Sequence, residues 1–243
     1  MACVIAFVNS KGGVGKSFLS TSMSVWLDDQ KKRVALIDAD DQRTSSRWLN
    51  GIPNHTVCNL QLAASSEEQR ADELRLKVNQ FRDDFDYIII DTKGAAGMTT
   101  SVAVIKSDIT CIPLQPSASD LWAIENALAT VRISQEATGG SPHATLILNF
   151  TNDRDVGALH VRRLATEFGI KVASTNIKRL NAYRDAPGSD LAPTQLLGSR
   201  GKKACNRLER LFNELLVESL QKQRQNDKTY KTGERLPEDQ RTY

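Results

Sequence analysis

Apolar runs rich in β-branched residues alternate with longer segments of helical periodicity along most of the chain. The apolar runs predict strands over residues 3–8, 34–37, 87–90, 109–114, 145–149 and 172–175. The helical pattern predicts helices over residues 17–29, 66–82, 98–106, 119–137, 155–168 and 200–222. This alternation is typical of an α/β fold, with a mainly parallel, twisted sheet and helices on both faces.

The expected domain covers residues 1–222, and residues 223–243 contain little that is apolar, which predicts a disordered polar tail. Hydrophobic residues make up 40% of the 243 and charged residues 25%, as in soluble globular proteins. No apolar run approaches the roughly 20 residues that a membrane-spanning helix needs. The cysteines are far apart, which argues against a zinc ribbon or a disulfide framework. These features predict a reduced, cytoplasmic protein.

A glycine-rich loop follows the first predicted strand and reads N-S-K-G-G-V-G-K-S over residues 9–17. Glycines let the backbone turn its N–H groups inward and form an anion site at a helix N-terminus. Lys16 is expected to reach the β- and γ-phosphates of a nucleotide, and the Ser17 hydroxyl is expected to bind Mg²⁺. The loop therefore predicts ATP and Mg²⁺ as cofactors. The other residues expected to contact the nucleotide here are Gly12, Gly13, Val14, Gly15 and Phe18.

The loop departs from the strict G-x-x-x-x-G-K-[ST] pattern, because Ser10 stands where the first glycine belongs and Lys11 is added. The form K-G-G-x-G-K-[ST] resembles the deviant Walker A motif of the ParA/MinD family of dimeric P-loop ATPases. The resemblance covers about residues 2–220. It implies that Lys11 crosses a face-to-face homodimer and contacts the phosphates bound to the partner. Because the first strand is expected at residue 2 or 3, the likeness is to small ParA-type members that lack an N-terminal helix-turn-helix domain.

Two predicted strands end in acidic residues. The strand over 34–37 leads into D-A-D-D-Q, which is similar to the family's D-x-D-P-Q segment with Asp41 in place of proline. The resemblance implies that Asp38 organises the attacking water. The strand over 87–90 ends at Asp91, which is expected to hold Mg²⁺, usually through a water. The family often continues D-T-P-P-G, whereas here Lys93 and Gly94 follow Asp91-Thr92. The pattern assigns no role to Lys93.

Other segments resemble the family by position. Asn149 ends the strand over 145–149, and Pro187 lies in a D-A-P segment; relatives contact the adenine base at these places. The segment over 112–117 resembles one that shapes the dimer face, although a simple capped helix after it explains the residues equally well.

Charge is distributed unevenly. The net charge of the chain is 32 − 29 = +3; residues 1–153 carry 14 basic and 18 acidic side chains, whereas residues 154–210 carry 12 and 5. The basic segment is either a footprint for a polyanion or a solvated face without a partner. The resemblance implies nonspecific binding of DNA by the ATP-bound dimer. The candidate DNA-binding residues are Lys171, Lys178, Arg200, Lys202, Lys203 and Arg207.

The function expected from the resemblance is that of a nucleoid-associated ATPase with slow hydrolysis. A ParB-like or other cargo-adaptor protein would stimulate hydrolysis, and the cargo would be a plasmid, a chromosome or a protein body. The alternative is a nucleotide-gated adaptor with negligible hydrolysis, acting in DNA transfer or in MinD-like positioning at a membrane. The polar segment after the last predicted helix argues against a membrane-binding terminus, because such a helix is expected at the extreme end. A metabolic ligase or kinase would need a small-molecule pocket that these motifs do not provide.

Overall fold

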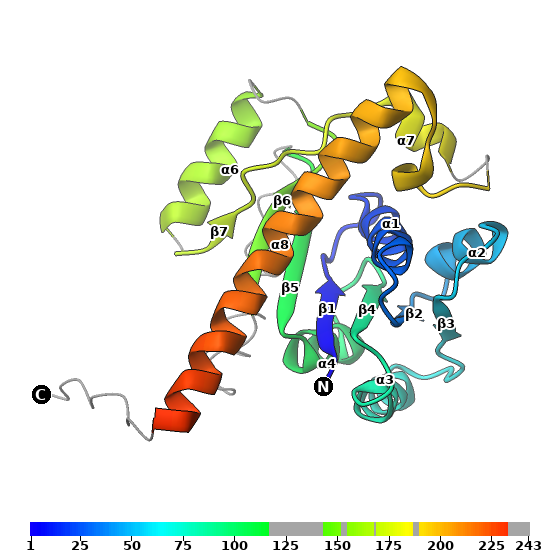
Figure 1. The fold of residues 1–243 in the computed structure, drawn as a ribbon, viewed down its shortest axis with the longest axis vertical. Helices are drawn as coiled ribbons and strands as arrows, with labels where there is room; N and C mark the ends of the chain where they lie inside the picture. Colours follow the sequence, from blue (N-terminus) through cyan, green and yellow to red (C-terminus); the bar gives the residue numbers. More distant parts are fainter. Residues whose placement is uncertain (117–142, 152–154, 168, 187–189, 233–243) are drawn as a thin grey trace, which may run out of the picture.

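The computed structural model describes residues 1–116, 143–151, 155–167, 169–186 and 190–232. The strands are β1 (Cys3–Phe7), β2 (Val34–Ala39), β3 (Cys58–Gln61), β4 (Tyr87–Thr92), β5 (Ile109–Leu114), β6 (His143–Leu148) and β7 (Lys171–Val172). The helices are α1 (Lys16–Asp29), α2 (Thr44–Gly51), α3 (Glu67–Phe81), α4 (Met98–Lys106), α6 (Val156–Glu167), α7 (Asn181–Asp185), the 3₁₀ turn η2 (Pro193–Gln195) and α8 (Gly198–Thr232). Figure 1 shows their arrangement.

The strands form one seven-stranded parallel sheet in the order β3-β2-β4-β1-β5-β6-β7. β1 lies in the middle, between β4 and β5. The predicted α/β fold is therefore confirmed. Parallel register places the ends of β1, β2 and β4 at the same edge of the sheet, where ligands bind in folds of this class.

Helices cover both faces of the sheet. Successive residues of β1 point to opposite faces, so that Ile5 and Phe7 belong to one buried cluster and Val4 and Ala6 to the other. The first cluster contains residues of α1 and α8, and the second contains residues of α3, α4 and α6. Burial on both faces explains why the strands read as continuous apolar runs.

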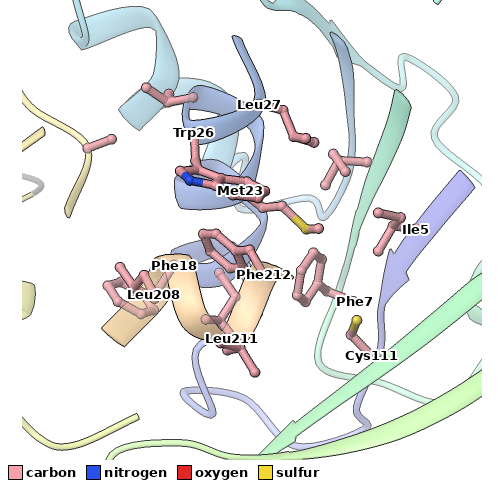
Figure 2. Packing of buried hydrophobic residues seen from close by; sticks show 14 of the residues in the cluster. Ile5, Phe7, Phe18, Met23, Trp26, Leu27, Cys111, Leu208, Leu211 and Phe212 are labelled. Carbon is pink, nitrogen blue, oxygen red and sulfur yellow. The ribbon is translucent and has the colours of Figure 1, made fainter. Parts of the chain in front are cut away.

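The last helix, α8, supplies a large part of the first cluster. Leu208, Leu211 and Phe212 are fully buried, and Figure 2 shows them facing α1 and the central strand. The rings of Phe212 and Trp26 lie with centroids 5.4 Å apart and planes inclined at 50°. The stripe of leucines that predicted this helix is the stripe that anchors it to the sheet.

The structure differs from the sequence predictions at several elements. α2, β3 and α7 were not predicted, and β7 covers only Lys171–Val172 of the region around the predicted strand at 172–175. α8 continues to Thr232, past the end predicted at residue 222. Glutamine, arginine and lysine in this stretch favour a helix, and neither glycine nor proline interrupts them before Gly233. The helix predicted over 119–137 lies outside the described residues. No helix in the described part of the chain is both long and apolar enough to span a membrane.

We expect Phe212→Ala to lower the free energy of unfolding by about 3–5 kcal/mol, because it leaves a cavity between α8 and α1. Urea unfolding followed by circular dichroism measures this change. Val217→Ala is the control in the same helix, because Val217 is 49% exposed and its truncation should cost no more than about 0.5 kcal/mol. Equal effects of the two substitutions would show that α8 is not anchored through this cluster.

Candidate nucleotide-binding site

The glycine loop lies between β1 and α1 and has the backbone conformation that an anion site requires. Gly13 and Gly15 have positive φ angles of 75° and 96°, which side-chain-bearing residues rarely adopt. Gly15 is the N-cap residue of α1, and no side chain caps this helix end. The N–H groups of the first turn are therefore left to bind an anion such as a phosphate.

Hydrogen bonds with the end of β5 and the residue after it hold the loop from one side. The Asn9 side chain donates to the carbonyl of Pro113 at 2.8 Å and accepts from the backbone N–H of Lys11 at 2.8 Å. The Gln115 side chain donates to the carbonyl of Gly13 at 2.9 Å. Residues at the end of β5 and just beyond it thus fix the start and the middle of the loop, a role for Asn9 and Gln115 that the sequence did not suggest.

Asn149, at the end of β6, holds the loop from the other side. Its amide donates to the carbonyl of Val14 at 2.7 Å. A Cβ on Gly15 would lie 2.1 Å from the Asn149 Nδ2 and 3.2 Å from the Phe150 ring. Gly15 is therefore required by close packing as well as by its φ angle. The structure places Asn149 against the predicted phosphate loop, and a contact with adenine stays a prediction.

Lys16 is buried at the start of α1, with only 6% of its surface exposed. Its ammonium donates to the carbonyl of Lys11 at 3.1 Å. Burial lowers the pKa of Lys16, and the charges of Asp91 and Asp40 oppose this shift. The ammonium therefore lies against the glycine loop and close to the acidic residues, and its contact with the β- and γ-phosphates stays a prediction.

Asp91 is completely buried at the end of β4, and neither of its carboxylate oxygens has a hydrogen-bond partner of acceptable geometry. Burial is the main cause that raises its pKa to about 7; Asp38 adds to the rise, and the hydroxyls of Ser17 and Ser45 and the charge of Lys16 oppose it. A carboxylate that lacks partners beside a serine hydroxyl fits hydrated Mg²⁺, which prefers oxygen ligands. No group of three or more acidic, histidine or cysteine side chains in the described residues could hold a metal, so this cation would also need phosphate oxygens.

Asp38 lies beside Asp91 on the neighbouring strand and has different contacts. The two residues are in register between β2 and β4. Asp38 is buried, and its oxygens accept from the backbone N–H groups of Asp40 at 3.0 Å and Ser46 at 2.9 Å. Ser46 lies in the first turn of α2, whose own N-cap residue, Arg43, provides no side-chain cap. Asp38 therefore caps α2 from the sheet, and this bond fixes the orientation of its carboxylate.

An aromatic pocket of about 670 Å³ opens beside the start of α1. The Phe18 ring lies with its centroid 5.0 Å from that of Tyr183, 5.5 Å from that of Phe150 and 6.3 Å from that of Trp48. Rings of this kind suit a planar base. The sequence predicted Phe18 at the nucleotide but not Trp48 or Tyr183, because the four rings come from four separate places in the chain.

Comparison with known proteins agrees with this geometry. Residues 5–194 match the family model "CobQ/CobB/MinD/ParA nucleotide binding domain". The chain belongs to this family. A similar relative is the "Maintenance of carboxysome distribution protein A" of Halothiobacillus neapolitanus, 28% identical over 216 residues, which are 88% of this chain and 97% of the relative.

Solved structures share the fold of this MinD/ParA-family chain. The ATP complex of a Cyanothece McdA variant superposes with a TM-score of 0.71 at 15% identity, covering 90% of this chain and 96% of that one. MinD of Pyrococcus horikoshii with Mg-ADP gives a TM-score of 0.63 at 16% identity, covering 86% and 94%. The fold is therefore that of the P-loop ATPases in this family.

Of the remaining predicted residues in this MinD/ParA-family domain, Lys11 lies half-buried in the glycine loop, and its contact across a dimer stays a prediction. Lys202 and Lys203 are exposed on α8, and Lys178 is half-buried. Lys171 lies 3.9 Å from Glu214. The side chain of Arg200, and Pro187 as a whole, lie outside what the structure describes.

Arg207 has a structural contact that its charge did not reveal. It donates to the carbonyl of Asn176 at 2.7 Å. It also lines a polar groove of about 380 Å³ together with Lys203 and Arg210. Arg207 therefore stabilises the turn after β7, and its contact with DNA stays a prediction.

We expect Asp91→Asn to change how stability depends on pH in the nucleotide-free protein. The folded-state pKa of Asp91 is about 7, against 3.8 as the ordinary value. Between these values only the folded state keeps the proton, so the free energy of unfolding falls as pH rises from about 4 to about 7. Asparagine cannot ionise and avoids this loss. The advantage of the variant should grow by on the order of 2 kcal/mol between about pH 5 and about pH 8.

Urea unfolding at the two pH values measures the difference between the parent and Asp91→Asn. Asp72→Asn is the matched control, because Asp72 is an exposed carboxylate and its loss should leave the pH dependence almost unchanged. The same pH dependence in Asp91→Asn and the parent would contradict the raised pKa.

Proposed function

We propose that the chain is a Mg²⁺-dependent ATPase that dimerises on ATP, binds DNA nonspecifically in that state and positions a cargo. The observation that carries the proposal is the pair of buried carboxylates in register, Asp38 and Asp91, beside a glycine loop that contains a buried lysine. Membership of the family and the ATP and Mg-ADP complexes of similar structures support the same cofactors.

Each side chain has a distinct task in this proposal. Lys16 and the N–H groups of the loop would bind the β- and γ-phosphates, and Ser17 and Asp91 would hold Mg²⁺. Mg²⁺ supplies positive charge that neutralises the phosphate oxygens. Asp38, held by two backbone N–H groups, orients the attacking water. Since phosphoryl transfer depends mainly on positioning and charge stabilisation, these groups are sufficient for slow hydrolysis.

The dimer would complete the site. Lys11 from one protomer would contact the phosphates bound to the other, and this second cation would stabilise the charge that develops as the γ-phosphoryl group leaves. Nucleotide binding and dimerisation would then depend on each other. A ParB-like or other cargo-adaptor protein would set the hydrolysis rate. The similar carboxysome distribution protein supports a protein body as cargo beside a plasmid or a chromosome.

The exposed lysines of α8 would bind DNA. Lys202 and Lys203 are adjacent and exposed, and Lys203 lines the polar groove together with Arg210. Contacts of lysine with phosphates carry no sequence information and weaken steeply with salt. A dimer doubles the surface, so the affinity for DNA would follow the nucleotide state, and the protein would associate with the nucleoid in the cytoplasm.

We expect Lys16→Ala to weaken ATP binding at least about tenfold, because it removes the buried ammonium that lies against the backbone of the loop. Asp38→Asn should keep ATP binding and lower turnover on the order of a hundredfold, so that ATP-bound dimers accumulate. Asparagine keeps an oxygen that can accept from Ser46, which preserves α2. Isothermal titration calorimetry, phosphate release and light scattering measure the three properties. Undiminished turnover in Asp38→Asn would show that Asp38 does not take part in hydrolysis. If the parent protein forms ATP-driven dimers but hydrolyses ATP negligibly, the nucleotide-gated adaptor would be favoured instead.

We expect the ATP-bound protein, and not the ADP-bound protein, to be retained on DNA of unrelated sequences. The double substitution Lys202→Ala, Lys203→Ala should reduce this retention equally on all sequences and make it less dependent on salt, because each lysine releases counterions from the phosphates. Lys32→Ala, at an exposed lysine of the acidic part of the chain, is the control. Equal retention with both nucleotides would contradict the proposed nucleotide control.

A further inference from the structure

Helix α3 forms an ion pair with the loop that follows β2. Arg70 is buried, and its guanidinium contacts the carboxylate of Asp41 at 2.5 Å. The same guanidinium donates to the carbonyl of Ala64 at 2.9 and 3.3 Å. Because three contacts fix the Arg70 side chain, the pair restrains the loop over residues 38–43, which carries Asp38 at its start.

A second ion pair joins the same helix to the loop that follows β4. The Glu67 carboxylate contacts the ammonium of Lys93 at 2.5 Å and accepts from the backbone N–H of Thr99, at the start of α4, at 3.0 Å. Glu67 and Lys93 are only 27% and 24% exposed. Burial alone would raise the pKa of Glu67, but the hydrogen bonds from Lys93 and Thr99 lower it below its ordinary value. Glu67 therefore remains charged and holds both ends of this loop.

The loop after β4 also contacts the phosphate loop. A Cβ on Gly94 would lie 2.9 Å from the backbone nitrogen of Gly12. A Cβ on Gly97 would lie 2.5 Å from the Glu67 Oε1. The backbone between Lys93 and Gly97 is thus packed between α3 on one side and the phosphate loop on the other.

Glu67 and Arg70 are three residues apart, so they lie on the same side of α3. Their partners, Asp41 and Lys93, occupy two of the three positions at which the D-x-D-P-Q and D-T-P-P-G patterns have proline and this sequence does not; the third position is Gly94. Proline stiffens a loop through its own φ angle, whereas an ion pair stiffens it through contact with another element.

We propose that α3 is a charged brace in which Glu67 and Arg70 act as positioning residues for the two catalytic loops. The brace replaces the local rigidity of proline by two ion pairs from one helix. It restrains the segments that directly follow Asp38 and Asp91 before nucleotide binds. The consequence for turnover rests on the proposed function, whereas the restraint of the loops does not.

Amide hydrogen exchange of the nucleotide-free protein tests the restraint. Asp41→Asn removes the charge of one pair and should raise exchange in residues 39–43 at least about threefold; Lys93→Met should do the same in residues 93–99. Arg75→Met is the matched control, because it breaks an ion pair with Asp72 on the same helix that is exposed on both sides. Unchanged exchange in both loops of the two brace variants would overturn the proposal.

Steady-state ATP hydrolysis tests the positioning. Asp41→Asn and Lys93→Met should each lower kcat about fivefold with little change in KM, since the loops orient water and cation rather than bind the nucleotide. Lys93→Arg, which keeps the charge, should stay within about twofold of the parent. Compared with Asp41→Asn, Asp41→Pro should have a higher kcat and slower amide exchange in residues 39–43, because proline stiffens the loop without the charge.

The outcomes separate the brace from the proposed function. Faster exchange with an unchanged kcat would overturn the positioning role, as would an Asp41→Pro variant that is no better than Asp41→Asn. A parent protein without any hydrolysis would contradict the proposed function. The exchange measurements would still decide whether α3 restrains the loops, because they need no nucleotide.

Discussion

A carboxylate buried without a hydrogen-bond partner is the constraint on which the rest of this structure depends. Asp91 lies at the end of β4, where ionisation costs free energy because the surroundings cannot solvate the charge. Lys16 and the hydroxyl of Ser17 compensate it in part. The remaining cost is avoided when Asp91 is protonated or when a cation binds, and a ligand that binds only the folded state stabilises it. The stability of this region is thus linked to the occupancy of the proposed site.

Parallel register places a second carboxylate, that of Asp38, next to Asp91, and the two carboxylates have different hydrogen-bond partners. Asp38 accepts two backbone N–H groups and caps α2, so its charge is already satisfied and its orientation is fixed. Asp91 has no such donors. Two neighbouring acids with different surroundings can perform different tasks: one is a rigid hydrogen-bond acceptor suited to orienting a water, and the other is suited to a cation. The two tasks therefore belong to two neighbouring positions, one at the end of β2 and one at the end of β4.

The order of the main elements could be predicted from the sequence, because strands buried on both faces leave continuous apolar runs and the glycine loop has a recognisable pattern. α2 and β3 were missed because their residues favour these structures only weakly. The segment T-S-S-R-W-L-N-G contains poor helix formers, and α2 begins where Asp38 caps it from the sheet. β3 is only half-buried. The contacts of Asn9 with Pro113 and of Gln115 with Gly13 join residues about a hundred positions apart. They could therefore not be predicted from the local sequence.

The departures from the proline-containing patterns illustrate what the sequence can and cannot reveal. Asp41 and Lys93 stand out as charged residues where rigidity is expected, but their partners on α3 become apparent only in three dimensions. The arrangement also explains why glycines follow Lys93, since Gly94 and Gly97 must approach Gly12 and Glu67 closely. Glycines make a loop costly to order, and a partly buried ion pair offsets part of that cost. The sheet therefore positions the carboxylates, and the ion pairs of α3 restrain the loops that follow them. Because Gly94 contacts the phosphate loop directly, a displacement of α3 would reach both acidic loops and the phosphate loop together.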